Sequence, residues 1–168
     1  PKPTLALVNG AAFGGAVGLM ACCDSVICQD QANFCLSEVR IGLIPAVISP
    51  FVLNKVGPSL SRHLMTSAAV FNASQATSYG LVHQVVSIEQ LQQAKLDWIK
   101  QTLGNSPEAV AQIKTLLAQF NTASPLAKEH LANTLESTTE AIAAIRVSTN
   151  GQAGLKAFLE KTAAPWRS

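Results

Sequence analysis

The sequence predicts an α/β protein, and three observations indicate this fold class. Residues 4–8 form a short apolar run that ends at a turn signal, which is typical of a buried strand. Residues 16–23 are small and apolar, with Ala, Leu and Met among them, and predict a buried helix. Residues 25–28 form a second apolar run, so strand, helix and strand follow one another at the spacing of a βαβ unit with parallel strands.

A glycine-containing turn at residues 9–15 joins the first strand to the helix. A strand that turns through glycines into a helix leaves backbone N–H groups free at the helix start, where the helix dipole favours negative charge. Glycine also lets a ligand approach the backbone closely, so Gly14 and Gly15 are candidates for binding an anion or an oxyanion. Glycine spacing alone favours a simpler alternative, a tight turn packed against a neighbouring strand, and both interpretations stay open here.

Glu38 stands in one of the most apolar stretches of the chain, between Phe34 and Pro50. A buried carboxylate is costly unless it is paired, and loss of hydration raises its pKa toward the range that acid–base catalysis uses. The alternatives are that Glu38 pairs with Arg40 or another basic group, or that it faces water. The sequence does not decide between them.

The middle of the chain predicts two helices and one strand. Residues 58–67 have amphipathic spacing, and residues 74–79 form a short helix that Ser74 would cap. Residues 81–86 predict a strand in which His83 alternates with apolar neighbours. We therefore expect His83 to face solvent or a polar edge and to take no part in catalysis.

The last part of the chain predicts helices alone. Ser87 and Gln90 have the spacing of a capping box, and serine followed by proline opens a helix at Ser106 and again at Ser124. The expected helices cover residues 87–103, a segment from 107 onward, 125–147 and 151–161.

Composition limits the class of protein. The chain has 168 residues, enough for one domain with a sizeable core, and it is 48% hydrophobic but only 13% charged. A free monomer usually carries more surface charge, so we expect other subunits to cover part of the surface. The net charge of +2 disfavours nucleic-acid binding, and no uninterrupted apolar stretch predicts a membrane span. The first residue is not Met, and we expect the chain to start within a larger protein.

Four cysteines, at positions 22, 23, 28 and 35, lack the spacing of a metal site or a disulfide framework. Cysteine also serves as a small apolar core residue. Because no signal-peptide pattern is present, we expect reduced, buried thiols in a cytoplasmic protein that holds no metal.

Several short motifs occur in a characteristic order and spacing. They are Lys2-Pro3, the run from Val8 to Gly15, Cys23-Asp24, Phe34, Glu38, and residues 42–45, 73–76, 80–82 and 154–161. In this arrangement they resemble the crotonase (enoyl-CoA hydratase/isomerase) family over essentially the whole chain. The runs at residues 34–40 and 44–50 look most like the methylglutaconyl-CoA hydratase branch, which serves leucine and isoprenoid breakdown.

This resemblance implies a fold and an assembly. The fold is a crotonase-like spiral of ββα units, incomplete in this chain, followed by C-terminal helices that build a trimer, often paired into a hexamer. Residues 1–104 would be the C-terminal part of the spiral core, and residues 105–168 the helical oligomerisation region. The resemblance also implies that the family's N-terminal portion, which normally supplies several strands, one oxyanion donor and much of the CoA-binding surface, is absent from this chain.

The resemblance assigns catalytic roles to two residues. Gly15 matches the family's second oxyanion donor, with Gly14 beside it at the substrate. Glu38 matches the glutamate that moves a proton next to the thioester. Adding water to an unsaturated acyl thioester builds negative charge on the carbonyl oxygen, and aligned backbone N–H groups stabilise the resulting enolate.

Other positions follow the family pattern, and one departs from it. Ala46 falls where a backbone N–H can hold the reacting water, while Phe158 and Lys161 fall where C-terminal side chains approach the CoA nucleotide. Hydratases of the family commonly place a first glutamate three residues after the oxyanion glycine, and this position is Gly18 here. We therefore expect Glu38 to do the acid–base work without a second carboxylate from the protein, helped by a carboxylate of the substrate.

The expected activity is addition of water to the double bond of an enoyl-CoA such as 3-methylglutaconyl-CoA, with CoA as part of the substrate and no separate cofactor. Two alternatives stay open. One is a single-carboxylate isomerase, decarboxylase or dehydratase on the same scaffold, and the other is a non-catalytic acyl-CoA-binding subunit or an inactive fragment.

Overall fold

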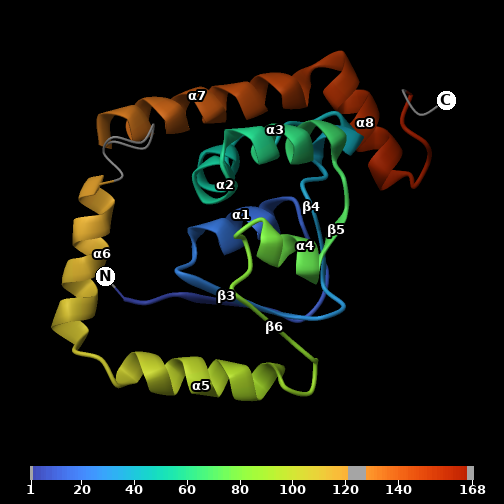
Figure 1. Ribbon diagram of the computed structural model, residues 1–168. Helices are drawn as coiled ribbons and strands as arrows, with labels where there is room; N and C mark the ends of the chain where they lie inside the picture. Colours follow the sequence, from blue (N-terminus) through green and yellow to red (C-terminus); the bar gives the residue numbers. More distant parts are fainter. Residues whose placement is uncertain (1, 121–127, 166–168) are drawn as a thin grey trace.

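The described structure, a computed structural model that covers residues 2–120 and 128–165, contains a parallel sheet (Figure 1). Its strands lie in the order β1 (Leu5–Val8), β3 (Ser25–Gln29) and β6 (Gln84–Val86), and all run parallel. Leu5 pairs with Ser25 and Val8 with Cys28. The predicted parallel pairing across the first helix is confirmed, while the strand expected at residues 81–86 is shorter than predicted.

The chain passes from β1 directly into a second, smaller sheet. Its strands lie in the order β2 (Ala12–Phe13), β4 (Asn33–Cys35) and β5 (Phe71–Asn72). The strands β2 and β4 run parallel, with Phe13 opposite Cys35, and β5 is antiparallel to β4. Because β2 leads into α1 (Gly15–Cys22), this pairing fixes where the helix begins. The predicted α/β class is confirmed.

Short helices cover the two sheets. A single turn of 3₁₀ helix, η1 (Glu38–Ile41), is followed by α2 (Ser49–Val56), α3 (Pro58–Ser67) and α4 (Ala73–Ser78). Helix α1 packs against α2, α2 against α3, and α3 against η1. Helix α3 has the predicted bounds, whereas α2 was not predicted because its residues follow an apolar run without helical spacing.

One apolar core joins the sheets to these helices. Phe34 stacks on Phe71 with ring centroids 5.5 Å apart, and both side chains are buried. Burying side chains of this size contributes roughly 1.5–3 kcal/mol each. The other large, fully buried core residues are Val17, Val26, Leu36, Val52, Leu64 and Leu81.

The remaining helices follow the outside of the core (Figure 1). They are α5 (Leu91–Leu103), α6 (Pro107–Phe120), α7 (Lys128–Val147) and α8 (Thr149–Leu159). Helix α5 packs on β3, and α8 returns to pack against η1. In the described part of the chain, no helix combines the length and the apolar composition that crossing a membrane requires.

Several details differ from the sequence-based expectations. Helix α4 is capped by Asn72, whose side chain accepts a hydrogen bond from the Gln75 backbone N–H, and not by Ser74. The helix expected to open at Ser87 starts only at Leu91, without a side-chain cap. The expected opening at Ser124 lies outside the described residues.

The cysteines are unpaired, as expected, but only two of them are buried. Cys28 and Cys35 lie in the core, and burial, with the nearby Asp30, raises the pKa of Cys28 to about 11. Cys22 is exposed and Cys23 is half-buried, because α1 presents its last turn to solvent. The expectation of four buried thiols was therefore wrong for these two.

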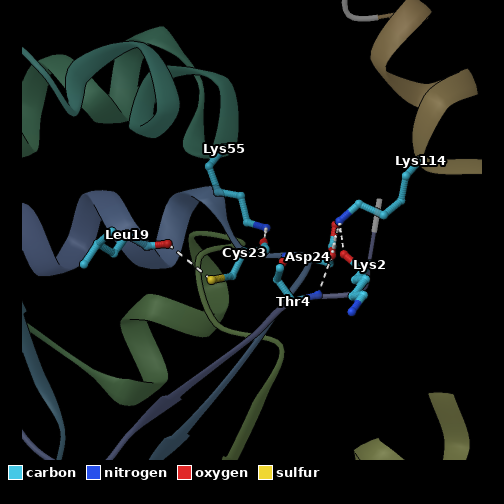
Figure 2. A network of polar contacts seen from close by, with 7 residues as sticks. All are labelled: Lys2, Thr4, Leu19, Cys23, Asp24, Lys55 and Lys114. Carbon is cyan, nitrogen blue, oxygen red and sulfur yellow. Dashed lines mark hydrogen bonds and ion pairs between the residues drawn. The ribbon is translucent and has the colours of Figure 1, made fainter. Parts of the chain in front are cut away.

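A polar network joins α6 to the start of β1 (Figure 2). The Asp24 carboxylate accepts hydrogen bonds from the Thr4 backbone N–H at 2.7 Å and the Thr4 hydroxyl at 2.8 Å. Lys114 of α6 forms an ion pair with the same carboxylate at 2.5 Å and also donates to the Lys2 carbonyl at 2.8 Å. Although burial alone would raise the pKa of Asp24, the bonds from Lys114 and Thr4 hold it below its ordinary value.

We predict that Asp24→Asn loosens α6. The pKa of Asp24 is lowered in the folded protein, so its stabilising contribution is present at neutral pH and is lost as the pH falls through that lowered pKa. Because the Asp24 side chain is 39% exposed, the expected loss in free energy of unfolding is only about 0.2–1 kcal/mol, and less in high salt. Hydrogen exchange should be faster in α6, whereas Asp30→Asn at an exposed site should leave it unchanged. Equal exchange in both variants would contradict the role of the network.

Candidate active site

The turn at Gly14 creates a free backbone donor. Gly14 has φ of 56°, a conformation that favours glycine, and its N–H donates to the Cys35 carbonyl at 2.8 Å. The chain then enters α1 at Gly15, which is exposed. The first N–H groups of a helix have no acceptor within it, and none of the described residues accepts a hydrogen bond from the Gly15 N–H. This N–H is therefore available to a ligand.

Strand pairing places Glu38 beside this turn. Because β2 and β4 run parallel, the segments that follow Phe13 and Cys35 leave the small sheet at the same edge. A Cβ atom added to Gly14 would lie 3.2 Å from Glu38 Oε1 and 3.6 Å from its Cδ. The carboxyl group therefore packs against the residue that immediately precedes the free Gly15 donor.

The Glu38 carboxyl group has no neutralising partner among the described residues. Its Oε2 atom is buried and accepts no hydrogen bond there. The Arg40 guanidinium, which the sequence offered as an ion-pair partner, instead donates to the Ala68 carbonyl at 2.5 Å. Burial raises the pKa of Glu38 above its ordinary value, and a hydrogen bond within its own residue opposes this only in part. The structure therefore shows a half-buried Glu38 with one buried, unpartnered carboxyl oxygen and no ion pair to the described residues.

Position 18, where hydratases of the family commonly have a glutamate, is covered by an aliphatic side chain. Gly18 is buried, and a Cβ atom there would overlap Ile48 Cγ2 and lie 2.5 Å from Ile48 Cβ. No side chain larger than hydrogen fits at position 18 unless Ile48 moves. Sequence reasoning noticed Gly18 but missed Ile48, because the contact joins distant segments and the run around Ile48 has no helical or strand periodicity.

The other expected binding residues lie in two places. Ala46 is buried just before α2, and no described residue accepts a hydrogen bond from its N–H. Phe158, at the end of α8, is 62% exposed, and Lys161 follows it in a left-handed conformation with φ of 55°. Helix α8 packs against η1, but neither of these two residues has a hydrogen bond to the Gly14–Glu38 contact. The structure thus brings Gly14, Gly15 and Glu38 together and leaves Phe158 and Lys161 exposed.

His83 lies away from this site and has a structural contact of its own. Its Nδ1 accepts a hydrogen bond from the Val26 backbone N–H at 2.9 Å, where β3 meets the segment before β6. Burial, with the positive charge of Lys55, lowers the pKa of His83, so the neutral acceptor form is favoured. The ring is exposed at this sheet edge, as the sequence predicted.

Comparison with known proteins places this site in a family. The model of the family described as enoyl-CoA hydratase/isomerase matches residues 1–168. The chain belongs to this enoyl-CoA hydratase/isomerase family. An enoyl-CoA hydratase, AFT6-1, of Alternaria alternata is 38% identical over 117 residues, which make up 69% of this chain and 39% of that protein.

Solved structures of the enoyl-CoA hydratase/isomerase family share the fold. An enoyl-CoA hydratase from Shewanella pealeana is 44% identical and has a TM-score of 0.69, with 99% of this chain and 60% of that chain covered. A carnitinyl-CoA hydratase from Mycobacterium avium is 27% identical and has a TM-score of 0.86, with 99% and 63% covered. The chain therefore spans less than two thirds of the relatives it matches.

We predict that Gly14→Ala destabilises the protein and displaces Glu38. The substitution forces a non-glycine residue into a backbone conformation with φ of 56° and ψ of −123°, outside the regions that L-residues adopt, at a cost of about 1–3 kcal/mol, and adds a methyl group 3.2 Å from the carboxyl oxygen. Urea denaturation measures the change. Gly10→Ala is the matched control, because a Cβ atom there meets nothing within 4 Å and the backbone is not left-handed. If Gly14→Ala lowers the free energy of unfolding no more than Gly10→Ala does, the described packing would be contradicted.

Proposed function

We propose that the complete protein adds water across the double bond of an enoyl-CoA thioester. One observation carries this proposal: the desolvated Glu38 carboxyl packs against Gly14, next to the free Gly15 N–H. An oxyanion donor beside an acid–base group is what the reaction requires. The relatives named as enoyl-CoA hydratases support the same reaction class.

The proposed reaction uses Glu38 as both base and acid. The Glu38 carboxylate takes a proton from water while the water oxygen forms a bond to the β-carbon of the acyl group. The π electron pair of the C=C bond moves toward the thioester, whose oxygen becomes an enolate held by the Gly15 N–H. The enolate then collapses, the α-carbon takes the proton back from Glu38, and the carboxylate is regenerated. A second oxyanion donor would come from outside this chain, as the family resemblance implies.

We further propose a branched, carboxylated substrate such as 3-methylglutaconyl-CoA, an intermediate of leucine degradation. Position 18 offers no second carboxylate, and Ile48 fills the space where one would project. A carboxylate carried by the substrate would supply the missing polar group near the reacting water, which the Ala46 N–H would also hold. Phe158 and Lys161 are exposed at the end of α8, as contact with the CoA nucleotide would require.

The single-carboxylate site also favours a second candidate, a dehydratase, isomerase or decarboxylase on the same scaffold. Such reactions need one acid–base group and the oxyanion donor, and the Gly18–Ile48 contact leaves no room for a second carboxylate at position 18. A non-catalytic role is less consistent with the site. A buried carboxyl oxygen without a partner is costly, and a purely structural carboxylate would normally be paired.

We propose that the complete protein is a homotrimer or a dimer of trimers in the cytoplasm. The outer helices expose large apolar side chains, which subunit contacts would bury. On α5 and α6 these are Leu96, Ile99, Leu103, Ile113, Leu116 and Leu117.

We predict that Glu38→Gln, made in the full natural polypeptide, lowers kcat by about 10²–10⁴ while leaving acyl-CoA affinity unchanged. Only ionised Glu38 can accept the water proton, so wild-type kcat/KM should rise as the pH increases through the pKa of Glu38, which burial raises above the ordinary value of a glutamate. This rising limb should be absent in Glu38→Gln. Steady-state rates over a pH series and calorimetric binding of a saturated acyl-CoA measure both effects.

The control for this experiment is Glu140→Gln, the same substitution at an exposed glutamate on α7. It should keep both the rate and the pH profile. A wild-type rate in Glu38→Gln would mean that another group is the base and would refute the proposed mechanism.

A further inference from the structure

The contact between Ile48 and Gly18 is tight and locally fixed. Ile48 immediately precedes α2, and its carbonyl accepts hydrogen bonds from the Phe51 and Val52 N–H groups, each at 3.1 Å. These bonds hold the Ile48 backbone at the helix start. The side chain therefore rests on the Gly18 backbone of α1, in the volume that a side chain at position 18 would need.

This contact lies close to the proposed oxyanion donor. Gly18 is three residues after Gly15 on α1, which corresponds to a rise of about 4.5 Å along the helix axis. Ile48 is only half-buried, so part of its side chain is accessible. Leu19 and Val47, its neighbours on the two segments, are 73% and 53% exposed. The accessible surface that Ile48, Val47 and Leu19 contribute around this contact is therefore hydrocarbon.

We propose that Ile48 is a specificity-determining residue that selects acyl groups with an apolar branch at the reacting carbons. This inference rests on the proposed function, because it takes the acyl thioester to be held at Gly15. An accessible hydrocarbon side chain one helical turn from the thioester oxygen would contact a substituent at the α- or β-carbon. A methyl branch would gain apolar contact with Ile48, whereas a linear acyl chain would leave this surface uncovered.

Binding of two saturated thioesters tests the proposal without requiring turnover. Butyryl-CoA and isovaleryl-CoA differ by one methyl branch at the β-carbon, and neither has a double bond to hydrate. We expect the full natural polypeptide to bind isovaleryl-CoA about tenfold more tightly, a typical discrimination for one methyl group in an apolar site. Ile48→Ala should remove most of this preference, and Ile48→Val should keep it within about threefold. Ile88→Ala, a truncation at an exposed isoleucine before α5, should leave the preference unchanged.

Two results would overturn the proposal. One is a wild-type protein that binds both thioesters equally, and the other is an Ile48→Ala variant that weakens both to the same extent. In either case Ile48 would be a packing residue. If the branched preference follows Ile48 but no enoyl-CoA is hydrated, the specificity role is supported and the hydratase proposal alone fails.

A double-mutant cycle tests the underlying contact separately. Gly18→Ala should lower the Tm in the presence of Ile48, and the loss should be largely relieved in Gly18→Ala/Ile48→Gly, because glycine removes both Ile48 Cγ2 and Ile48 Cβ and leaves the Cα at 3.6 Å. Strictly additive effects would show that the two positions do not touch and would refute the proposal at its first step.

Discussion

The packing of the Glu38 carboxyl group against the Gly14 backbone is the contact on which the candidate site depends. It exists because β2 and β4 pair in parallel, so the two segments leave the small sheet together. Gly14 meets two demands at once, a left-handed φ and the absence of a Cβ atom beside the carboxyl oxygen. Helix α1 starts at the next residue, Gly15, whose N–H donates to no described residue. One backbone turn thus fixes both groups to which the proposed function assigns acid–base and oxyanion roles.

The surrounding fold holds polar groups without hydrogen-bond partners, an arrangement that by itself lowers the stability of the folded protein. Glu38 Oε2 is buried without a hydrogen-bond partner, and the Gly15 N–H donates to no described residue. Helices α3 and α8 pack against η1, and Ile48 of the segment before α2 packs on α1. Apolar packing of this kind offsets the desolvation of one carboxyl group.

Local patterns predicted the βαβ unit and the glycine turn, because the strand and helix signals there lie within short stretches. The same patterns could not decide the environment of Glu38. Its potential partner Arg40 reaches the carbonyl of Ala68, a residue that only tertiary folding brings near. The cap of α4 was misassigned since Asn72 and Ser74 both have capping side chains, and the closing geometry selects Asn72. Ile48 escaped notice because nothing in its own segment signals a contact with Gly18.

The most direct test of the account compares two substitutions of Gly15 in the full natural polypeptide. Proline is tolerated at the first position of a helix and replaces the N–H by its ring Cδ, while alanine keeps the N–H and meets nothing within 4 Å at this position. If the Gly15 N–H holds the thioester oxygen, Gly15→Pro should lower the kcat for enoyl-CoA hydration by about 10²–10³, and Gly15→Ala should stay within about threefold of wild type. Equal rates in the two folded variants would contradict the central claim.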